Sequence, residues 1–229
     1  MQTENKLTVS VVLPCRNEEE ALGECLKQIK QVFADNNING EIIVSDSSTD
    51  RSPEIAREFG VILIKHDQIG YGRAYLEGFK IVKGEYIFMA DPDGSYDFYE
   101  IPKFIKYLTN GNDFILGNRF GGQMEKGAMP WLHRHIGSPF FSLLFKILFK
   151  TKIADVHCGM RAIKKETLNK LYLKSEGMEF ASEMIIKTIK NNLKIKQLNI
   201  NYTRRKGEPK LRPFIDGMRH IILIIKLVK

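Results

Sequence analysis

Cysteine is scarce in this sequence, and long apolar runs are absent from it. Three cysteines occur in 229 residues, an odd number at spacings that match no metal site, so we expect buried, reduced thiols in a cytosolic protein. They are Cys15, Cys25 and Cys158. No apolar run approaches the roughly 18 to 20 residues that a membrane-spanning helix needs. Residues 1–14 lack the basic and long apolar regions of a signal peptide, and we interpret them as leading into a strand.

Linkers, repeats and low-complexity tracts are also missing. Without a linker rich in Gly and Ser, we expect a single domain over residues 1–229, with one half at 1–120 and the other at 121–229. Lysine and arginine number 35 and the acidic residues 27, which gives a formal charge of +8. This charge suits phosphate-rich partners, namely nucleotides, anionic membrane surfaces or nucleic acid, and does not choose among them.

Short β-branched runs alternate with helix-like stretches in the first half. The expected strands are 7–14, 41–46, 61–66, 86–91 and 113–118. The expected helices between them are 18–36, 52–60, 72–84 and 98–111. The second half is expected to contain a helix at 179–192, a strand at 194–202 and a basic loop at 203–213. The alternation predicts an α/β fold with a mostly parallel sheet and helices on both faces, in which ligands bind beyond the carboxyl ends of the strands.

Two aspartates follow the fourth expected strand, in the stretch EYIFMADPDGSYD. Asp91 and Asp93 are two residues apart, so in extended geometry their carboxylates project to one side. Such hard oxygen ligands suit Mg²⁺ or Mn²⁺, which complete their coordination with water and substrate phosphates. Pro92 and Gly94 fit a tight turn, and Asp97 is expected to cap the next helix. We therefore predict a site for a metal ion and a diphosphate; the alternative is a solvated acidic turn.

A second polar stretch, VSDSSTDRSPE, follows the second expected strand. Its residues are typical of a sharp turn that begins a helix, and helix capping explains Ser48, Asp50 or Ser52. Capping does not require Asp46, which ends the strand. We expect the Asp46 carboxylate to accept a hydrogen bond from a ribose hydroxyl or from a base N–H.

Eight segments occur together in the order and approximate spacing of one enzyme family. They are VVLPCRNEEEAL, IIVSDSSTDRSPEIA, GYGRAYLEGF, YIFMADPDGSYD, FILGNRF, CGMRAI, EFASEM and RKGEPKL. Over essentially its whole length the chain resembles the family 2 glycosyltransferases, and within them the dolichol-phosphate or polyprenyl-phosphate mannose and glucose synthases. The resemblance implies a GT-A fold, a nucleotide-diphosphate sugar donor of the GDP-mannose or UDP-glucose type, a divalent cation, inverting transfer and a polyprenyl or dolichyl phosphate acceptor.

The resemblance also implies roles for individual residues. By this comparison, nucleotide-sugar binding falls to Pro14, Arg16, Glu18, Asp46, Asp91 and Lys210. Asp91 and Asp93 match the pair that bridges metal and diphosphate. Arg205 and Lys210 match a basic loop over the donor, in which a serine is usual where Pro209 stands, so the loop's role as a lid departs from the family pattern. The half at 1–120 would bind the nucleotide sugar, and the half at 121–229 the acceptor and the membrane.

The chemistry of such a transfer defines further roles. A metal ion on the aspartate pair would neutralise the departing diphosphate. A phosphate acceptor is largely ionised near neutral pH, so it needs cations more than a strong base, and for this we predict Arg119, Arg134, Arg161 and Arg205. The predicted catalytic residues are Asp93, Arg119, Glu183 and Arg205. Glu183 would be the base if the acceptor were a saccharide hydroxyl; alternatively it only pairs with Lys187 on a helix face.

Two apolar segments with interleaved lysines occur in the second half, at 137–150 and 220–229. The run at 139–149 is too short to span a bilayer and suits a helix in the membrane interface, with Trp131 as an anchor. The alternatives are a buried helix or a dimer contact. We expect a peripheral protein on the cytosolic face of a membrane. The sequence leaves open whether a membrane-spanning partner subunit or a homo-oligomer completes the enzyme.

Other motifs support rival functions weakly. The set His133, His135, His157 and Cys158 fits no common zinc site. GYGRAYLEGF lacks the Lys-Ser/Thr of a P-loop, and Gly70 and Gly72 are expected to bring a helix N-terminus close to the donor. DPDGS matches the nucleophile motif of haloacid-dehalogenase-like phosphohydrolases, but that family places it on the first strand. Without a bound metal ion, the acidic centre of the strand-end edge would repel a polyanion, and we expect no nucleic acid partner.

Overall fold

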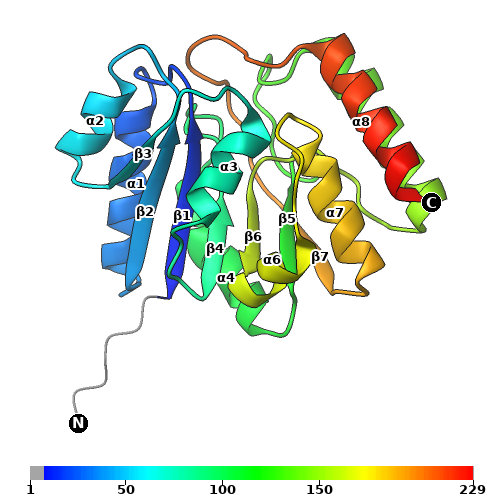
Figure 1. Cartoon of the computed structure of the whole chain (residues 1–229), viewed down its shortest axis with the longest axis horizontal. Helices are drawn as coiled ribbons and strands as arrows, with labels where there is room; N and C mark the ends of the chain where they lie inside the picture. The colour runs from blue at the N-terminus through cyan, green and yellow to red at the C-terminus, as the bar shows by residue number, and fades with distance from the viewer. Residues whose placement is uncertain (1–7, 229) are drawn as a thin grey trace.

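The computed structural model describes residues 8–228 and contains one seven-stranded sheet (Figure 1). Its strands are β1 (Val9–Cys15), β2 (Gly40–Asp46), β3 (Ile62–Lys65), β4 (Tyr86–Met89), β5 (Phe114–Asn118), β6 (Arg161–Lys164) and β7 (Ile195–Asn199). Their order is β3-β2-β1-β4-β6-β5-β7. The sequence predicts all of them except β6. Residues 1–7 of the expected N-terminal segment and Lys229 of the C-terminal apolar segment lie outside the described residues.

Strand β6 interrupts the parallel order of the sheet. β1 to β4 are parallel to one another, as are β5 and β7, whereas β6 lies antiparallel between β4 and β5. In this register Arg161 is opposite Met89 of β4 and Leu116 of β5. The sequence RAIK is too short to show a period, so no strand is predicted from it.

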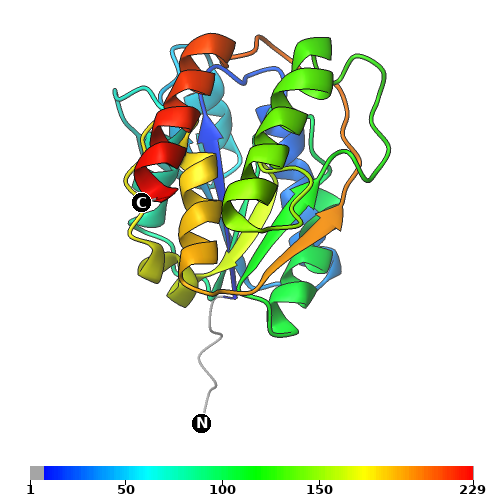
Figure 2. The ribbon, with the colours of Figure 1, turned by 90° about the vertical axis from the view of Figure 1, so that its right-hand side faces the viewer.

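Helices cover both faces of the sheet. They are α1 (Leu22–Asp35), α2 (Ser52–Glu58), α3 (Tyr71–Phe79), α4 (Ile101–Thr109), α5 (Ser138–Phe149), α6 (Lys165–Leu171), α7 (Phe180–Lys190) and α8 (Pro213–Val228), with a 3₁₀ turn η1 (Phe98–Glu100) and a π-helical turn η2 (His133–Gly137). Figures 1 and 2 show α3, α6 and α7 on one face and α1 and α4 on the other. Because both faces are covered, β1 is mostly apolar, and its residues Val11, Val12 and Leu13 are fully buried.

Most of the predicted helices are confirmed with shorter boundaries. α1 begins at Leu22 rather than at Glu18. The chain forms a turn before Leu22, in which the Glu18 N–H donates to the Ser52 hydroxyl at 3.0 Å. Asp97 caps the following segment as predicted, since its carboxylate accepts from the Tyr99 N–H at 2.9 Å. All three cysteines are buried and unpaired, in agreement with their prediction as thiols.

The second half contributes two apolar helices, α5 and α8. α8 packs against α7 (Figure 2). Phe141 of α5 contacts His220 of α8, with ring centroids 5.3 Å apart. Phe145 and Ile224 are buried, while other large apolar side chains of both helices are exposed. Within residues 8–228 no helix combines the length and apolar character that crossing a membrane requires. The helix expected at 139–149 is confirmed, and its location at a membrane stays a prediction.

Candidate active site

The carboxyl ends of β1 and β4 meet where the order of the sheet reverses. β1 has β2 and β3 on one side and β4 on the other. Val12 of β1 is paired with Met89 of β4, so the loops after these two strands are neighbours. The first loop contains Glu18, and the second contains Asp91 and Asp93. Open α/β sheets bind their ligands at such a point.

Asp91 and Asp93 belong to a turn, which corrects the expectation of an extended pair. β4 ends at Met89, short of both aspartates. Asp93 Oδ1 accepts from the N–H of Ser95 at 3.0 Å and from its hydroxyl at 2.5 Å. Gly94 between them has a φ of +80°, a conformation that glycine adopts without strain. The turn therefore orients Asp93 through Ser95 rather than through strand geometry.

Two buried carboxylate oxygens in these loops have no hydrogen-bond partner among the described residues, namely Oδ1 of Asp91 and Oε2 of Glu18. Burial, and then the charge of Asp93, raise the pKa of Asp91 to about 7. Burial also raises the pKa of Glu18, although Lys210 and Arg205 oppose it. Buried polar atoms normally have partners, and hard oxygen donors without one fit Mg²⁺ or Mn²⁺. We call the carboxylates of Glu18, Asp91 and Asp93 the acidic cluster.

The basic segment 203–213 connects β7 to α8 (Figure 1) and contacts the acidic cluster. Arg205 Nη1 lies 3.5 Å from Asp93 Oδ2, and its Nη2 lies 3.3 Å from Glu18 Oε1. Lys210 Nζ is 2.7 Å from the same Glu18 oxygen. The structure thus brings both predicted cations to the predicted acidic residues, and the predicted contact of Glu18 with the nucleotide sugar stays a prediction.

Pro14 and Arg16 lie at the end of β1. Pro14 is partly buried in the strand, and Arg16 is exposed just beyond it. No hydrogen bond or ion pair with another described residue engages the Arg16 side chain, so its guanidinium is available to a ligand. Lys210 donates to the Asn17 carbonyl at 2.9 Å and joins the basic segment to this loop.

Asp46, at the end of β2, is fully buried and already bonded. It accepts from the N–H of Ser48 at 3.2 Å, from the Ser48 hydroxyl, and from Lys65 Nζ at 2.8 Å. The Ser48 hydroxyl in turn accepts from the Asn17 N–H at 2.7 Å. Asp46 therefore organises the contact between the loops after β1 and β2. Its predicted contact with a nucleotide base stays a prediction.

Arg119, after β5, is held by an acidic partner that the sequence did not reveal. Its Nε and Nη2 donate to the two carboxylate oxygens of buried Asp155 at 2.7 and 2.9 Å, and its guanidinium lies 5.2 Å from the Tyr202 ring centroid. Burial would lower the pKa of Arg119, but Asp155 raises it well above its ordinary value, so the cation persists. A single aspartate within the apolar stretch IADVHCGMRAI is the signal that would have pointed to Asp155.

The prediction that Arg161 binds an acceptor phosphate is wrong. Its side chain is 1% exposed, and its guanidinium donates to the carbonyls of Cys158, Ala181 and Val156 at 2.7, 3.1 and 3.4 Å. These bonds join β6 to α7 and to the segment that precedes β6. An arginine enclosed in this way stabilises packing and offers no donor to a substrate.

Glu183 is enclosed as well. Its carboxylate accepts from the N–H groups of Lys174 and Ser175 at 3.0 and 2.7 Å and pairs with Lys187 at 2.7 Å. Burial would raise the pKa of Glu183, but the bonds from Lys187, Ser175 and Lys174 bring it below its ordinary value. A carboxylate so stabilised as an anion is a weak base, so the structure favours the alternative in which Glu183 pairs with Lys187.

The glycines at the start of α3 allow close packing against residues 175–177, and their predicted role near the donor stays a prediction. A Cβ on Gly72 would lie 2.2 Å from the Ser175 carbonyl oxygen, and a Cβ on Gly70 would lie 2.4 Å from that of Glu176. The N–H of Gly72 donates to the Gly177 carbonyl at 3.2 Å. The N-terminus of α3 therefore faces this loop.

Arg134 lies on η2 among exposed apolar side chains. It is exposed, and no hydrogen bond or ion pair with a described residue engages its side chain. His133 and His135 belong to the same turn. In the part of the chain that the structure describes, no three His, Cys, Asp or Glu side chains are arranged to hold a metal ion by themselves.

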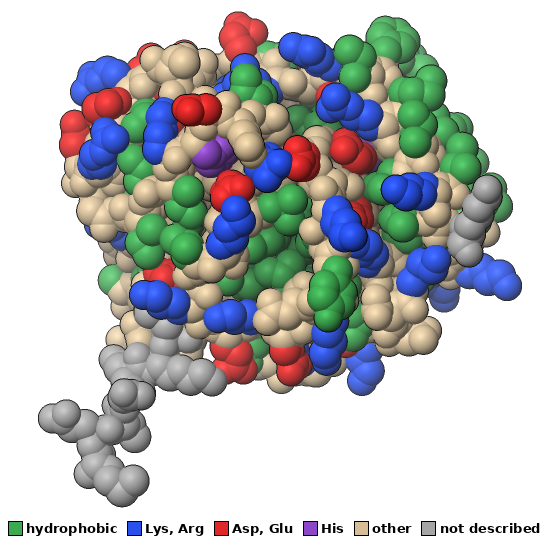
Figure 3. All heavy atoms as spheres, viewed as in Figure 1, with side chains coloured by type: hydrophobic (Ala, Val, Ile, Leu, Met, Phe, Trp, Pro, Cys, Tyr) green, Lys and Arg blue, Asp and Glu red, His purple; other side chains and the backbone are tan. Residues whose placement is uncertain are grey.

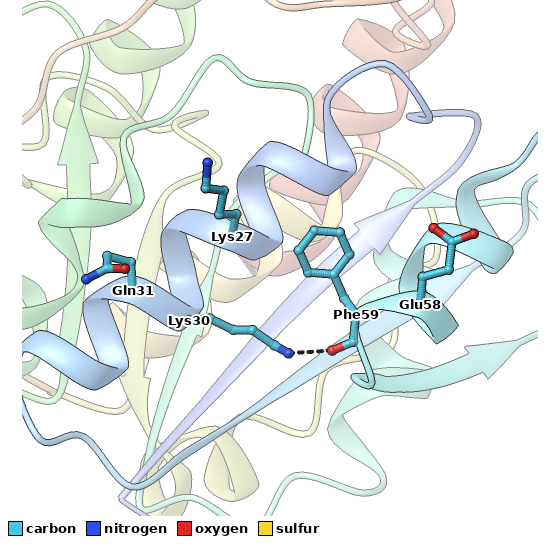
Figure 4. Close-up of a pocket in the computed structure, with 5 residues that line it drawn as sticks. All are labelled: Lys27, Lys30, Gln31, Glu58 and Phe59. Carbon is cyan, nitrogen blue, oxygen red and sulfur yellow. Dashed lines mark hydrogen bonds between the residues drawn. The ribbon is translucent and has the colours of Figure 1, made fainter.

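A separate depression lies between α1 and the end of α2 (Figure 4). It is lined by Lys27, Lys30, Gln31, Glu58 and Phe59, and Lys30 donates to the Phe59 carbonyl. None of the predicted site residues contributes to it. The chemistry-bearing side chains gather instead at the carboxyl edge of the sheet.

The family follows from comparison with known proteins. Residues 10–172, more than half of the chain, match the model of glycosyl transferase family 2. The chain is 43% identical over 215 residues to the low-salt glycan biosynthesis hexosyltransferase Agl6 of Haloferax volcanii, covering 93% of this chain and 52% of that protein. It is 32% identical to a dolichyl-phosphate hexose transferase of the same organism, covering 91% of this chain and 89% of the relative. The chain belongs to glycosyl transferase family 2.

Solved structures confirm the fold. Glucosyl-3-phosphoglycerate synthase from Mycobacterium tuberculosis, in complex with Mn²⁺, UDP and glucosyl-3-phosphoglycerate, aligns with a TM-score of 0.75 at 20% identity, over 96% of this chain and 80% of that one. Mannosyl-3-phosphoglycerate synthase from Rubrobacter xylanophilus aligns with a TM-score of 0.72 at 18% identity, over 97% of this chain and 73% of that one. The sheet and its helices are therefore those of a GT-A glycosyltransferase. The family match and the two sequence relatives, rather than the fold, replace the phosphohydrolase alternative.

Proposed function

We propose that this protein transfers a hexose, with inversion, from a nucleotide-diphosphate sugar to a polyprenyl or dolichyl phosphate at a membrane surface. One observation carries the proposal. At the switch point of the sheet, the acidic cluster contains two buried oxygens without a partner among residues 8–228, and it faces cations from the segment 203–213. Such a site takes a ligand that combines a divalent cation with phosphates.

The donor would lie over the ends of β1, β2 and β4. Asp91 and Asp93 would hold Mg²⁺ or Mn²⁺, which neutralises the departing diphosphate when bound. Two carboxylates are enough for such an ion, because water and phosphate oxygens complete its coordination. Arg16 supplies an unengaged guanidinium beside the nucleotide, and Asp46 lies at the position proposed for the base.

The acceptor phosphate needs arginine side chains whose N–H groups are not all engaged in hydrogen bonds within the protein. Arg134 is exposed and unengaged, and Arg205 is held by two long ion pairs of 3.3 and 3.5 Å. Arg119 has two nitrogens on Asp155, and its remaining Nη1 makes no hydrogen bond with a described residue. We therefore assign the acceptor phosphate to Arg119, Arg134 and Arg205. Because the acceptor is an ionised phosphate, no general base is required.

The lipid part of the acceptor is suggested by the outer faces of η2, α5 and α8. Trp131, Leu143, Ile147, Phe214 and Ile222 are each more than half exposed. Figure 3, in the orientation of Figure 1, shows hydrophobic side chains gathered over α8. An apolar surface of this kind beside lysines suits the boundary between lipid headgroups and acyl chains, and we propose the cytosolic face of a membrane.

The donor site is tested by thermal stabilisation. GDP, UDP, GDP-mannose and UDP-glucose are each added with and without Mn²⁺, because a ligand of the native state raises the melting temperature by mass action. We expect one nucleotide to stabilise the protein only with metal, and Asp93→Asn to remove the effect. Asp97→Asn, in the same motif, is the control and retains it. No shift with any nucleotide would contradict the proposal.

The acceptor is tested by comparing two lipids that differ only in the phosphate. With the stabilising sugar nucleotide, we expect transfer to a polyprenyl phosphate and none to the corresponding free polyprenol. Transfer to the free alcohol would instead require a base and would return Glu183 to the mechanism.

A further inference from the structure

A cation that belongs to the protein occupies part of the acidic cluster. Arg205 bridges Asp93 Oδ2 and Glu18 Oε1, and Lys210 shares the same Glu18 oxygen. Glu18 is only 8% exposed, so its carboxylate needs these partners. Asp93 Oδ1 is committed to Ser95, which leaves Oδ2 as the oxygen that an external cation would use.

Arg205 neutralises only part of the negative charge of the acidic cluster. Its ion pairs are long, its own Nε is buried without a partner among the described residues, and Asp91 Oδ1 and Glu18 Oε2 are unpartnered as well. Three carboxylates thus face two side-chain cations that bond to only two of them. A divalent ion would satisfy Asp91 as well as Asp93, but it would repel a guanidinium 3.5 Å from the same oxygen.

We propose that Arg205 and the divalent cation are alternative occupants of Asp93, and that Glu18 is a positioning residue that retains the displaced Arg205 and Lys210 at the edge of the site. Arrival of the metal moves the Arg205 guanidinium off Asp93 while Lys210 keeps the segment attached through Glu18. The guanidinium is then available to an incoming phosphate. This inference rests on the metal site of the proposed function.

The geometry of the segment is suited to such an exchange. Lys206 N–H donates to the Asp93 carbonyl at 2.7 Å, so the backbone beside Arg205 stays attached to the turn whichever cation is present. Gly207 follows with a φ of +70°, and a Cβ there would lie 3.9 Å from Glu18 Oε2. The backbone therefore turns directly over the cluster, and a side-chain movement of Arg205 is enough to clear Asp93.

The exchange is tested without nucleotide, sugar or lipid. Binding of Mn²⁺ alone is measured by the electron paramagnetic resonance of the free ion for the wild type, Arg205→Gln and Arg204→Gln. Arg205→Gln is expected to bind Mn²⁺ about tenfold more tightly, since a competing positive charge is removed. Arg204→Gln removes the same charge from the neighbouring position, where the side chain pairs with Glu125, and should change the affinity less than about twofold.

A second readout follows the segment itself in the wild type. Trypsin cleavage after Arg205, followed by mass spectrometry, should become faster with Mn²⁺ alone, because the side chain leaves Asp93 and keeps only its ion pair with Glu18. Glu18→Gln should show rapid cleavage already without metal, since Arg205 and Lys210 lose their shared partner. Slower cleavage of the wild type with Mn²⁺ would overturn the exchange.

The outcomes separate this inference from the proposed function. Equal or weaker Mn²⁺ binding by Arg205→Gln overturns the exchange, even if the wild type binds Mn²⁺ together with a nucleotide. If the wild type binds Mn²⁺ neither alone nor with GDP or UDP, the metal-dependent function fails and the exchange fails with it.

Discussion

The carboxyl edge above β1 and β4 and the interior around β6 and α7 both contain buried charges, but they differ in how those charges are partnered. In the acidic cluster, Asp91 and Glu18 each have an oxygen without a partner among the described residues. Around β6, Arg161 is enclosed by backbone carbonyls, and Glu183 by backbone N–H groups and Lys187. The carboxylates of the candidate site thus have unmet hydrogen-bonding capacity, which Arg161 and Glu183 lack, although both regions contain buried charge.

The same comparison explains why the two regions respond differently to substitution. A saturated buried ion contributes to stability through its partners, so removing it leaves those partners unsatisfied. An unsaturated buried carboxylate lowers stability until a ligand arrives. A substitution in the acidic cluster should therefore lower activity and raise stability. A substitution of Arg161 or Glu183 should lower stability.

The largest effect is expected from Asp91→Asn, which tests that opposition. Loss of a metal ligand should lower kcat/KM for hexose transfer by about 1,000-fold. The metal-free variant should nevertheless be more stable than the wild type at pH 8. The pKa of Asp91 is about 7 in the folded protein and roughly 3.9 in the unfolded chain, so between these values the native state binds more protons and the free energy of unfolding falls as pH rises.

Urea unfolding in EDTA measures this difference at two pH values. At pH 5 Asp91 is protonated in the native state, and the variant and the wild type should be alike. At pH 8 the variant should gain about 1 to 2 kcal/mol. Asp97→Asn serves as the control, because asparagine caps a helix as well as aspartate does. A variant less stable than the wild type at pH 8 would show that Asp91 is already satisfied.

The next largest effect is expected at Arg161, in comparison with Arg134. The sequence predicts that both arginines bind the acceptor phosphate. Arg161→Met should lower the free energy of unfolding by about 3 kcal/mol, because three buried carbonyls lose their donor. Arg134→Gln, at an exposed and unengaged position, should change it by less than about 0.5 kcal/mol and should raise KM for polyprenyl phosphate about tenfold. Unfolding curves and acceptor titrations measure both. A stable Arg161→Met protein with a raised acceptor KM would restore Arg161 to the site.

A smaller effect is expected from the buried imidazoles that join α8 to the core. His157 and His220 have ring centroids 4.4 Å apart, and burial, then Arg161, lower the pKa of His220 to about 4. An unfolded histidine titrates near 6.5, so below that pH the unfolded chain binds more protons and the free energy of unfolding falls, by about 2 kcal/mol for His220 between pH 7 and 4.5.

His220→Phe tests this by keeping a ring and removing the titration. Loss of the 2.7 Å bond to Ser182 should lower stability at pH 7 by about 1 kcal/mol. The loss of stability between pH 7 and 4.5 should become smaller, and His157 and Asp91 contribute to the pH dependence that remains. An unchanged slope would assign the acid sensitivity to other groups.

The smallest effect on stability is expected on the outer faces of the apolar helices. Phe214 is 88% exposed and Ile222 59% exposed, so the double variant Phe214→Ser, Ile222→Ser should change the free energy of unfolding by less than about 0.5 kcal/mol. Its binding to anionic vesicles should fall about tenfold, since apolar area that would enter the lipid is lost.

A matched control removes an exposed aromatic side chain elsewhere. Tyr172 is 77% exposed after α6, and Tyr172→Ser should leave vesicle binding unchanged. Vesicle sedimentation and analytical ultracentrifugation are run on the same samples. A double variant that binds vesicles normally but loses self-association would assign this surface to a second copy of the chain.

Local patterns predicted much of the architecture because each long element contains its own signal. The runs that became β1, β2 and β5 are apolar and bounded by polar turns, and their place in an alternating order predicted a parallel sheet. β6 was missed because it has four residues and inserts antiparallel between strands far from it in sequence. The misassignment of Arg161 follows from the same cause, since only the register of β6 shows that its side chain is enclosed.

The sequence by itself determined the α/β alternation, the acidic residues at strand ends and the membership of a glycosyltransferase family, because these depend on residue type and on neighbours along the chain. Only the tertiary structure decided which charges are satisfied. Arg205 reaches Glu18 across 187 positions, and Arg119 reaches Asp155 across 36. Partnership at such separations is set by the order and register of the strands, and burial then makes an unpartnered charge far more costly than it would be in water.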